Sequence, residues 1–341
     1  MKKFKYISYA LLLSAMLFFI GCSSEKIESE IQENTGITVV TTLFPQYDFV
    51  RQIAKDKANV ILLLPPGVEA HSYEPTPRDI VTIENASLFV YTGETMEPWA
   101  QKVINTVNSE KLIVVDSSEG LLDPMDHDEE SIEHDDDHED HEDHDDDHDE
   151  EHDEHDEEHD EHGHGQDPHI WLDPVKAKEM VGHILAGLIE ADPQNTDFYK
   201  SNAQVYLLQL DGLHQNINES LMDFEHKEIM VGGHFAFGHF AERYEIEVES
   251  AYEGFAPNAE PSPKRIAELI DHMNEMDMRY IYHEELVDPK IAKVIANETK
   301  AELLILHGAH NLSKEELESG ITYIEIMEGN LERLVIGFKN E

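Results

Sequence analysis

The sequence predicts an α/β protein of two lobes, each built on a parallel β-sheet, joined by a long rigid helix. Short apolar or β-branched runs alternate with helical patterns over residues 37–115, and a second series of the same kind starts at Ile229. Such alternation is typical of parallel α/β sheets. Between the two series, residues 195–222 form a helical pattern too long for one more crossover helix. The 341 residues also exceed one ordinary hydrophobic core, which favours two domains.

The first lobe is expected to begin with a buried strand at 37–43, because this run is β-branched and lies between Gly36 and Pro45. The other strands expected in this lobe are 60–64, 88–91 and 112–115. The expected helices are 47–54, 78–85 and 98–107. The breaks between these elements are short, so neighbouring strands are expected to be parallel.

Two helices, 174–189 and 195–222, are expected to follow, the second being the connector between lobes. The strands expected in the second lobe are 229–231, 246–250, 280–283 and 303–306. Its expected helices are 238–243, 263–276, 289–299 and 323 to the C-terminus. We therefore divide the chain into an N-terminal lobe at 36–173, a helical segment at 174–222 and a C-terminal lobe at 223–341.

The first 22 residues have the pattern of an export signal. Three lysines within the first five residues precede the 14-residue apolar stretch 7–20, and Gly21-Cys22 follows. Fourteen residues are short for a membrane span but suit a signal peptide. The cysteine after the apolar stretch resembles the lipobox of bacterial lipoproteins, which implies that Cys22 is lipidated and that residues 23–35 form a polar tether. Because Cys22 is the only cysteine, neither an intrachain disulfide nor a cysteine zinc site is expected.

An acidic, histidine-rich segment occupies residues 126–165. It holds 11 of the 22 histidines and 25 of the 74 acidic residues, with no lysine or arginine, and so carries half of the net charge of −50. Such a run is expected to be a disordered insert. Its evenly spread histidines also indicate loose collection of divalent metal, zinc above all. The rest of the chain keeps a charge of −25, which argues against a nucleic-acid partner.

Four histidines lie where ligands bind in α/β proteins, in loops beyond the carboxyl ends of strands or at the junction of the lobes. They are His71, His169, His234 and His310. Two come from each half, as expected for a metal site in the cleft between lobes. Four neutral imidazoles favour zinc over the harder manganese. His307 lies three residues before His310 in the same loop and competes for the fourth position.

Three segments resemble, in order, the metal-binding segments of a known family. They are 67–75 (GVEAHSYEP), 167–174 (DPHIWLDP) and 233–237 (GHFAF). The family comprises the metal-binding solute-binding proteins of ABC importers, and the resemblance is to its zinc branch (ZnuA/AdcA type), in which an acidic histidine-rich insert precedes the second segment. The resemblance covers roughly residues 37–341 of this chain.

The resemblance implies two lobes joined by a long helix, little hinge motion and a metal held between the lobes. It implies that His71, His169 and His234 are ligands; a histidine at position 234, where manganese members have glutamate, favours zinc. The fourth family position, an acid in many members, falls on His310. Glu69 is a further candidate, as a carboxylate ligand or as the holder of a water molecule.

The implied function is capture of Zn²⁺ outside the cell and delivery to an ABC permease, by a monomer that is lipid-anchored at the outer face of a bacterial cell membrane. A manganese or iron receptor of the same fold, and a surface adhesin or zinc buffer, are the alternatives. Since metal competes with protons for imidazole, zinc affinity is expected to fall as pH drops through about 6.5.

An enzyme is not expected. The sequence closest to a zinc-protease motif, His283-Glu284-Glu285-Leu286-Val287, lacks the second histidine of His-Glu-x-x-His. Four histidine ligands would also leave a zinc ion no open position for catalytic water. The chain contains no P-loop pattern, so ATP binding is not expected either.

Overall fold

The structure is a computed structural model that describes residues 36–107, 111–122, 166–252 and 261–339. The expected insert at 126–165 and the expected lipidation site Cys22 lie outside these residues. All of these described residues belong to one compact unit. Within the described part, no helix is long and apolar enough to cross a membrane.

The N-terminal half contains a four-stranded sheet in the order β2-β1-β3-β4, with every neighbouring pair parallel. Its strands are β1 (Ile37–Thr41), β2 (Ala58–Leu62), β3 (Leu88–Tyr91) and β4 (Ile113–Asp116). Its helices are α2 (Phe44–Ala54), η2 (Lys55–Lys57), α3 (Pro77–Glu84) and α4 (Ala100–Thr106). Helix α2 begins three residues earlier than predicted because Pro45 occupies its first turn, where a missing N–H costs nothing.

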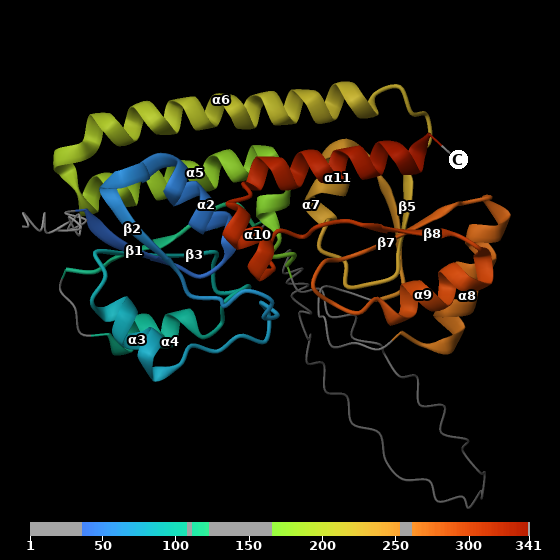
Figure 1. Cartoon of the computed structure of the whole chain (residues 1–341), viewed down its shortest axis with the longest axis horizontal. Coiled ribbons are helices and arrows are strands. Elements are labelled where there is room, and N and C mark those ends of the chain that lie inside the picture. The colour runs from blue at the N-terminus through green and yellow to red at the C-terminus, as the bar shows by residue number, and fades with distance from the viewer. Residues whose placement is uncertain (1–35, 108–110, 123–165, 253–260, 340–341) are drawn as a thin grey trace, which may run out of the picture. The chain divides into compact units, whose positions relative to one another are not determined.

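The second half repeats the arrangement, with a parallel sheet in the order β6-β5-β7-β8 (Figure 1). Its strands are β5 (Glu228–Val231), β6 (Glu247–Ser250), β7 (Tyr280–His283) and β8 (Glu302–Ile305). Its helices are α7 (Gly238–Tyr244), α8 (Pro263–Glu275), α9 (Lys290–Thr299), α10 (Lys314–Ser319) and α11 (Tyr323–Phe338). Two parallel sheets with flanking helices and one long helix confirm the predicted fold class.

The segment between the sheets consists of η3 (Ile170–Leu172), α5 (Pro174–Ala191), η4 (Pro193–Asn195) and α6 (Thr196–Leu221). The 26 residues of α6 span about 39 Å at 1.5 Å per residue. This helix contacts both halves: Asn202 Nδ2 donates to the Ile53 carbonyl of α2, and His214 Nδ1 lies 3.0 Å from the Tyr244 hydroxyl of α7. It therefore connects the two halves by contacts as well as by sequence.

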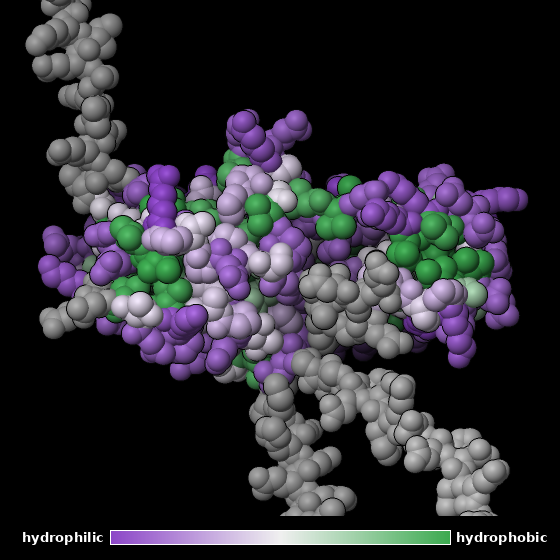
Figure 2. Space-filling view, turned by 90° about the horizontal axis from the view of Figure 1, so that it is seen from below, coloured by the Kyte–Doolittle hydropathy of each residue, from purple (hydrophilic) through white to green (hydrophobic). Residues whose placement is uncertain are grey.

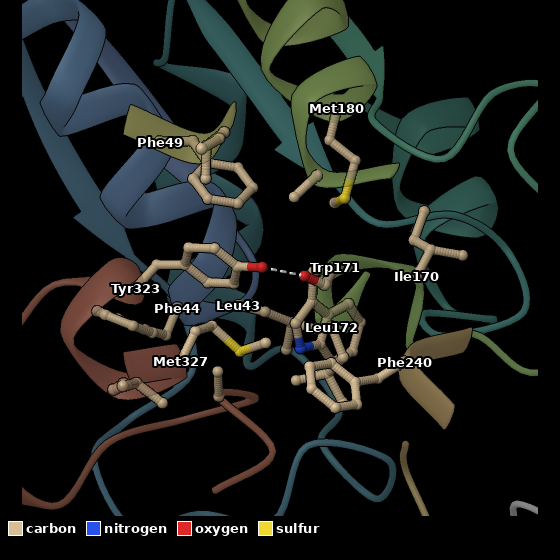
Figure 3. Close-up of a cluster of buried hydrophobic side chains, with 14 of the residues drawn as sticks. Leu43, Phe44, Phe49, Ile170, Trp171, Leu172, Met180, Phe240, Tyr323 and Met327 are labelled. Carbon is tan, nitrogen blue, oxygen red and sulfur yellow. Dashed lines mark hydrogen bonds between the residues drawn. The ribbon is translucent and has the colours of Figure 1, made fainter. Parts of the chain in front are cut away.

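One continuous apolar core joins the two halves. It includes Phe49 of α2, Trp171 of η3 and Tyr323 of α11, all fully buried. The Tyr323 hydroxyl donates to the Trp171 carbonyl at 2.5 Å (Figure 3), and the Phe49 and Tyr323 rings meet edge to face at 5.1 Å. Outside this core, the face shown in Figure 2 is mostly hydrophilic, with hydrophobic residues in separate groups.

A buried carboxylate lies near the carboxyl ends of β1 and β3. Glu97 is 2% exposed and accepts hydrogen bonds from the Thr92 and Gly93 amides and the Thr42 hydroxyl. Burial raises the pKa of Glu97 to about 7, although these hydrogen bonds oppose the shift. The folded chain therefore holds a proton on Glu97 at pH values where the unfolded chain has lost it.

Replacing Glu97 with Gln is expected to stabilise the protein in a pH-dependent way. Since the folded pKa is raised, the wild-type chain loses stability as pH rises from about 4.5 through 7, by roughly 3 kcal/mol at 1.36 kcal/mol per pKa unit. Gln mimics the neutral acid, so the stability of the variant relative to wild type should grow between pH 5 and pH 8. Urea unfolding of both proteins at pH 5 and pH 8 measures the difference in their free energies of unfolding. If that difference is the same at both pH values, the prediction is wrong.

Candidate metal centre

The structure brings together the four histidines predicted from the sequence. His71 follows β2, His169 precedes η3, His234 follows β5 and His310 follows β8. One ring nitrogen from each lies within 4.8 Å of the others. Together they form the group of possible metal ligands found among the described residues. Tetrahedral zinc with bonds of about 2.0–2.1 Å separates its nitrogens by about 3.4 Å, so small side-chain movements suffice to enclose an ion.

Burial differs among the four rings. His169, His234 and His310 are 0%, 5% and 8% exposed, whereas His71 is half-buried. The Nε2 atoms of His71 and His169 lie 3.1 Å apart, so these rings point at a common centre. Nε2 of His310 is buried without a hydrogen-bond partner among the described residues. Buried polar atoms are normally paired, and a metal ion at the common centre would supply the partner.

Backbone contacts between the halves fix the loop that carries His310. Phe44 N–H donates to the His310 carbonyl, and Asn311 Nδ2 donates to the carbonyls of Pro65 and Val68 at 2.7 and 2.8 Å. Pro65 and Val68 belong to the loop that carries His71. His71 and His310 are therefore held opposite each other by hydrogen bonds that do not involve their rings.

His169 is positioned by Asp167 and by its own neighbour Trp171. Asp167 Oδ1 lies 2.6 Å from His169 Nδ1 and also accepts the His169 N–H at 3.0 Å. This carboxylate orients the ring with Nε2 toward the cluster, as outer carboxylates do behind metal-bound histidines. Trp171 Nε1 donates to the Gly308 carbonyl at 2.8 Å, which ties this segment to the His310 loop.

The site disfavours protonated imidazole. Burial, followed by the neighbouring His310 and His234, lowers the pKa of His71 to about 3. Burial and the same neighbours hold the pKa of His169 well below its usual value. Both rings are therefore neutral at physiological pH, the state in which imidazole binds a metal ion.

These shifts alter the pH dependence expected from the sequence. An unshifted imidazole would weaken zinc binding about 25-fold between pH 7 and pH 5, but His71 and His169 take up no proton in that range. Zinc binding at pH 6 is therefore expected to release at most two protons per ion, because two of the four rings are already neutral. Calorimetry in buffers of different ionisation enthalpy counts these protons, and a release above two would contradict the prediction.

His307 and Glu69, the other candidates, have different contacts. The Ala309 N–H donates to His307 Nδ1 at 2.9 Å, and His307 Nε2 lies 3.5 Å from a Glu316 oxygen. Glu69 accepts the N–H groups of His71 and Ser72, both at 2.7 Å, and so shapes the His71 loop. Neither belongs to the convergent cluster. The assignment of the fourth ligand to His310 remains a prediction.

Two further histidines, His239 and His283, have structural contacts. His239 Nε2 donates to the Asp167 carbonyl at 2.9 Å, while Lys176 Nζ donates to its Nδ1 at 3.1 Å. His283 Nδ1 donates to the Glu284 carbonyl at 2.7 Å. Asp167 had no role predicted from the sequence, although it lies only two residues before His169.

Comparison with known proteins gives the family. The family model described as "Zinc-uptake complex component A periplasmic" (ZnuA) matches residues 39–337. The chain is 34% identical over 331 residues to the high-affinity zinc uptake system protein ZnuA of Bacillus subtilis, covering 97% of each chain. It is 33% identical to the zinc-binding lipoprotein AdcA of Streptococcus pneumoniae, with 97% of this chain spanning 60% of that protein.

A solved structure agrees with this result. The crystal structure of the Zn(II)-bound ZnuA-like domain of Streptococcus pneumoniae AdcA matches with a TM-score of 0.70 and 29% identity, covering 90% of this chain and 100% of that one. Sequence and structure thus lead to the same group of proteins, and the chain belongs to the ZnuA family of zinc-uptake proteins.

Proposed function

We propose that this chain is the zinc receptor of an ABC-type importer, which captures Zn²⁺ outside the cell and delivers it to the permease. The observation that carries the proposal is the convergence of four histidines, three of them buried, from both halves of the chain. Four imidazole nitrogens suit zinc, whereas manganese prefers carboxylate oxygens. The B. subtilis and S. pneumoniae relatives, named for zinc uptake and zinc binding, support the same metal.

In this proposal His71, His169, His234 and His310 hold the ion. His71, the least buried of the four, meets the incoming ion first and releases it last. Three buried rings complete a shell that excludes water, so the site binds zinc and performs no hydrolysis.

Two further parts of the proposal concern residues outside the described ranges. Cys22 is proposed to anchor the chain by lipid at the outer face of the bacterial membrane. Residues 126–165 are proposed to bind further zinc ions weakly and either to raise the local supply of zinc or to sense it. The receptor is also proposed to act as a monomer whose N-terminal lobe (36–173), helical segment (174–222) and C-terminal lobe (223–341) are as divided above.

Zinc and manganese titrations test the metal assignment. The chain starting at Ser23 is compared with the same chain lacking residues 126–165. We expect one tight zinc site in both, extra weak sites only when the segment is present, and much weaker binding of manganese. Failure of the shortened chain to bind zinc tightly, or a preference for manganese, would overturn the proposal.

A further inference from the structure

Two adjacent carboxylates, Glu284 and Glu285, lie between the histidines of the second half. They directly follow β7, which in the sheet order β6-β5-β7-β8 lies between β5 and β8. Strand β5 leads to His234 and β8 leads to His310. Because the strands are parallel, all three loops emerge at the same edge of the sheet.

Each carboxylate faces one of these rings. Glu284 Oε2 lies 3.4 Å from His234 Nδ1, and Glu285 Oε1 lies 3.7 Å from His310 Nδ1. With Asp167 behind His169, three of the four clustered histidines have a carboxylate at Nδ1. A carboxylate there favours a hydrogen on Nδ1 and leaves the Nε2 lone pair free for a metal.

Glu285 also fixes the backbone of the His310 loop. Its Oε2 accepts the Gly308 N–H at 2.7 Å. A side chain at position 308 would meet the His310 ring, since a Cβ built there lies 2.4 Å from Cε1 and 2.5 Å from Nδ1. Because glycine has no side chain, the His310 ring can lie against residue 308 while Glu285 accepts the N–H of the same residue.

The charges of these groups fit a buried dication. Four neutral imidazoles leave the charge of Zn²⁺ uncompensated, and an uncompensated charge is costly away from water. The Glu285 side chain is only 8% exposed, and its ion pairs among the described residues are with His307 and His310. No lysine or arginine pairs with this nearly buried carboxylate within the described part of the chain, so its negative charge can balance the metal.

We propose that Glu284 and Glu285 are positioning residues that set the tautomers of His234 and His310 and balance the charge of the bound ion from behind the ligands. This inference rests on the proposed zinc-receptor function. The separations of 3.4 and 3.7 Å exceed a formed hydrogen bond. A metal on Nε2 makes Nδ1–H a stronger donor, so both separations shorten when zinc binds.

The test uses Glu284→Gln and Glu285→Gln in the intact mature chain, with Glu316→Gln as the matched control. Gln keeps the shape but removes the charge. Glu316 contacts His307 and caps α10, a role that Gln can also fill. We expect each of the first two variants to weaken tight zinc binding by about 10- to 100-fold, measured by chelator competition, and the control to change it less than about twofold.

Two further readouts separate positioning from folding. Urea unfolding of the metal-free variants should show that both remain folded. Long-range ¹H–¹⁵N spectra of the zinc-loaded protein should show Nδ1–H and metal-bound Nε2 in His234 and His310, with the Nδ1 proton signal displaced in the Gln variants. If the unmutated chain binds zinc tightly and both Gln variants bind it equally well, this inference is overturned and the proposed function stands. Weak zinc binding by the wild-type chain would overturn the proposed function as well.

Discussion

Replacing His169 with Ala should abolish tight zinc binding. His169 is fully buried, its Nε2 points at His71, and Asp167 holds its Nδ1. The truncation removes one ligand from the centre, and no other described histidine belongs to the cluster. Losing only the group that hydrogen-bonds a metal ligand costs about 10- to 100-fold in metal affinity. Losing the ligand itself should therefore lower zinc affinity by at least about 100-fold.

Chelator competition on the chain lacking residues 126–165 measures this effect. His226→Ala is the control, because His226 is exposed and lies outside the cluster. Its zinc affinity should equal that of the parent chain. If His169→Ala also binds zinc within about threefold of the parent, His169 is not a ligand of the tight site.

Replacing Trp171 with Ala should produce the largest loss of stability. Trp171 is fully buried in the core shared by the two halves, and its ring lies 5.4 Å from the rings of both His169 and His310. Truncation of a buried tryptophan costs about 3–5 kcal/mol through lost burial and the cavity left behind. The hydrogen bond to the Gly308 carbonyl is lost as well.

Urea unfolding of the metal-free chain at pH 7 gives the free-energy difference. Trp171→Phe is the informative companion, because it keeps most of the packing and removes the hydrogen bond to Gly308. The stability lost in Trp171→Phe should be smaller than in Trp171→Ala. The Gly308 carbonyl is left without its hydrogen bond from Trp171, which costs about 1–3 kcal/mol. A loss below about 1 kcal/mol in Trp171→Ala would show that Trp171 does not hold the halves together.

The strands and the histidines His71, His169 and His234 could be predicted because their signals are local. Buried parallel strands appear as short apolar runs, and ligand-bearing loops follow their carboxyl ends. Helix α10 was missed, although Ser313 and Glu316 form a capping box that marks its start. Its six residues gave too short a periodic pattern to be recognised.

Sequence alone could not choose between His307 and His310, because the choice depends on backbone geometry and distant contacts. Ala309 adopts a left-handed conformation with φ +54°, which turns the chain between the two histidines. The His307 N–H donates to the Asn330 side chain on α11, 23 residues away. Contacts of this range are invisible in a local pattern.

Glu284 and Glu285 show a different limit. In the sequence they matched only an incomplete zinc-protease motif, so they received no role. Their position becomes meaningful once the strand order places β7 between β5 and β8. Strand order follows from packing of the whole sheet, which residue spacing does not reveal.

Zinc-edge X-ray absorption tests the central claim most directly. The sample is the chain lacking residues 126–165, loaded with one zinc ion, so that a single site contributes to the signal. We predict four imidazole nitrogens at about 2.0–2.1 Å and no oxygen or sulfur in the first shell. Three imidazoles with an oxygen ligand, or a shell dominated by carboxylate oxygen, would contradict the four-histidine zinc site.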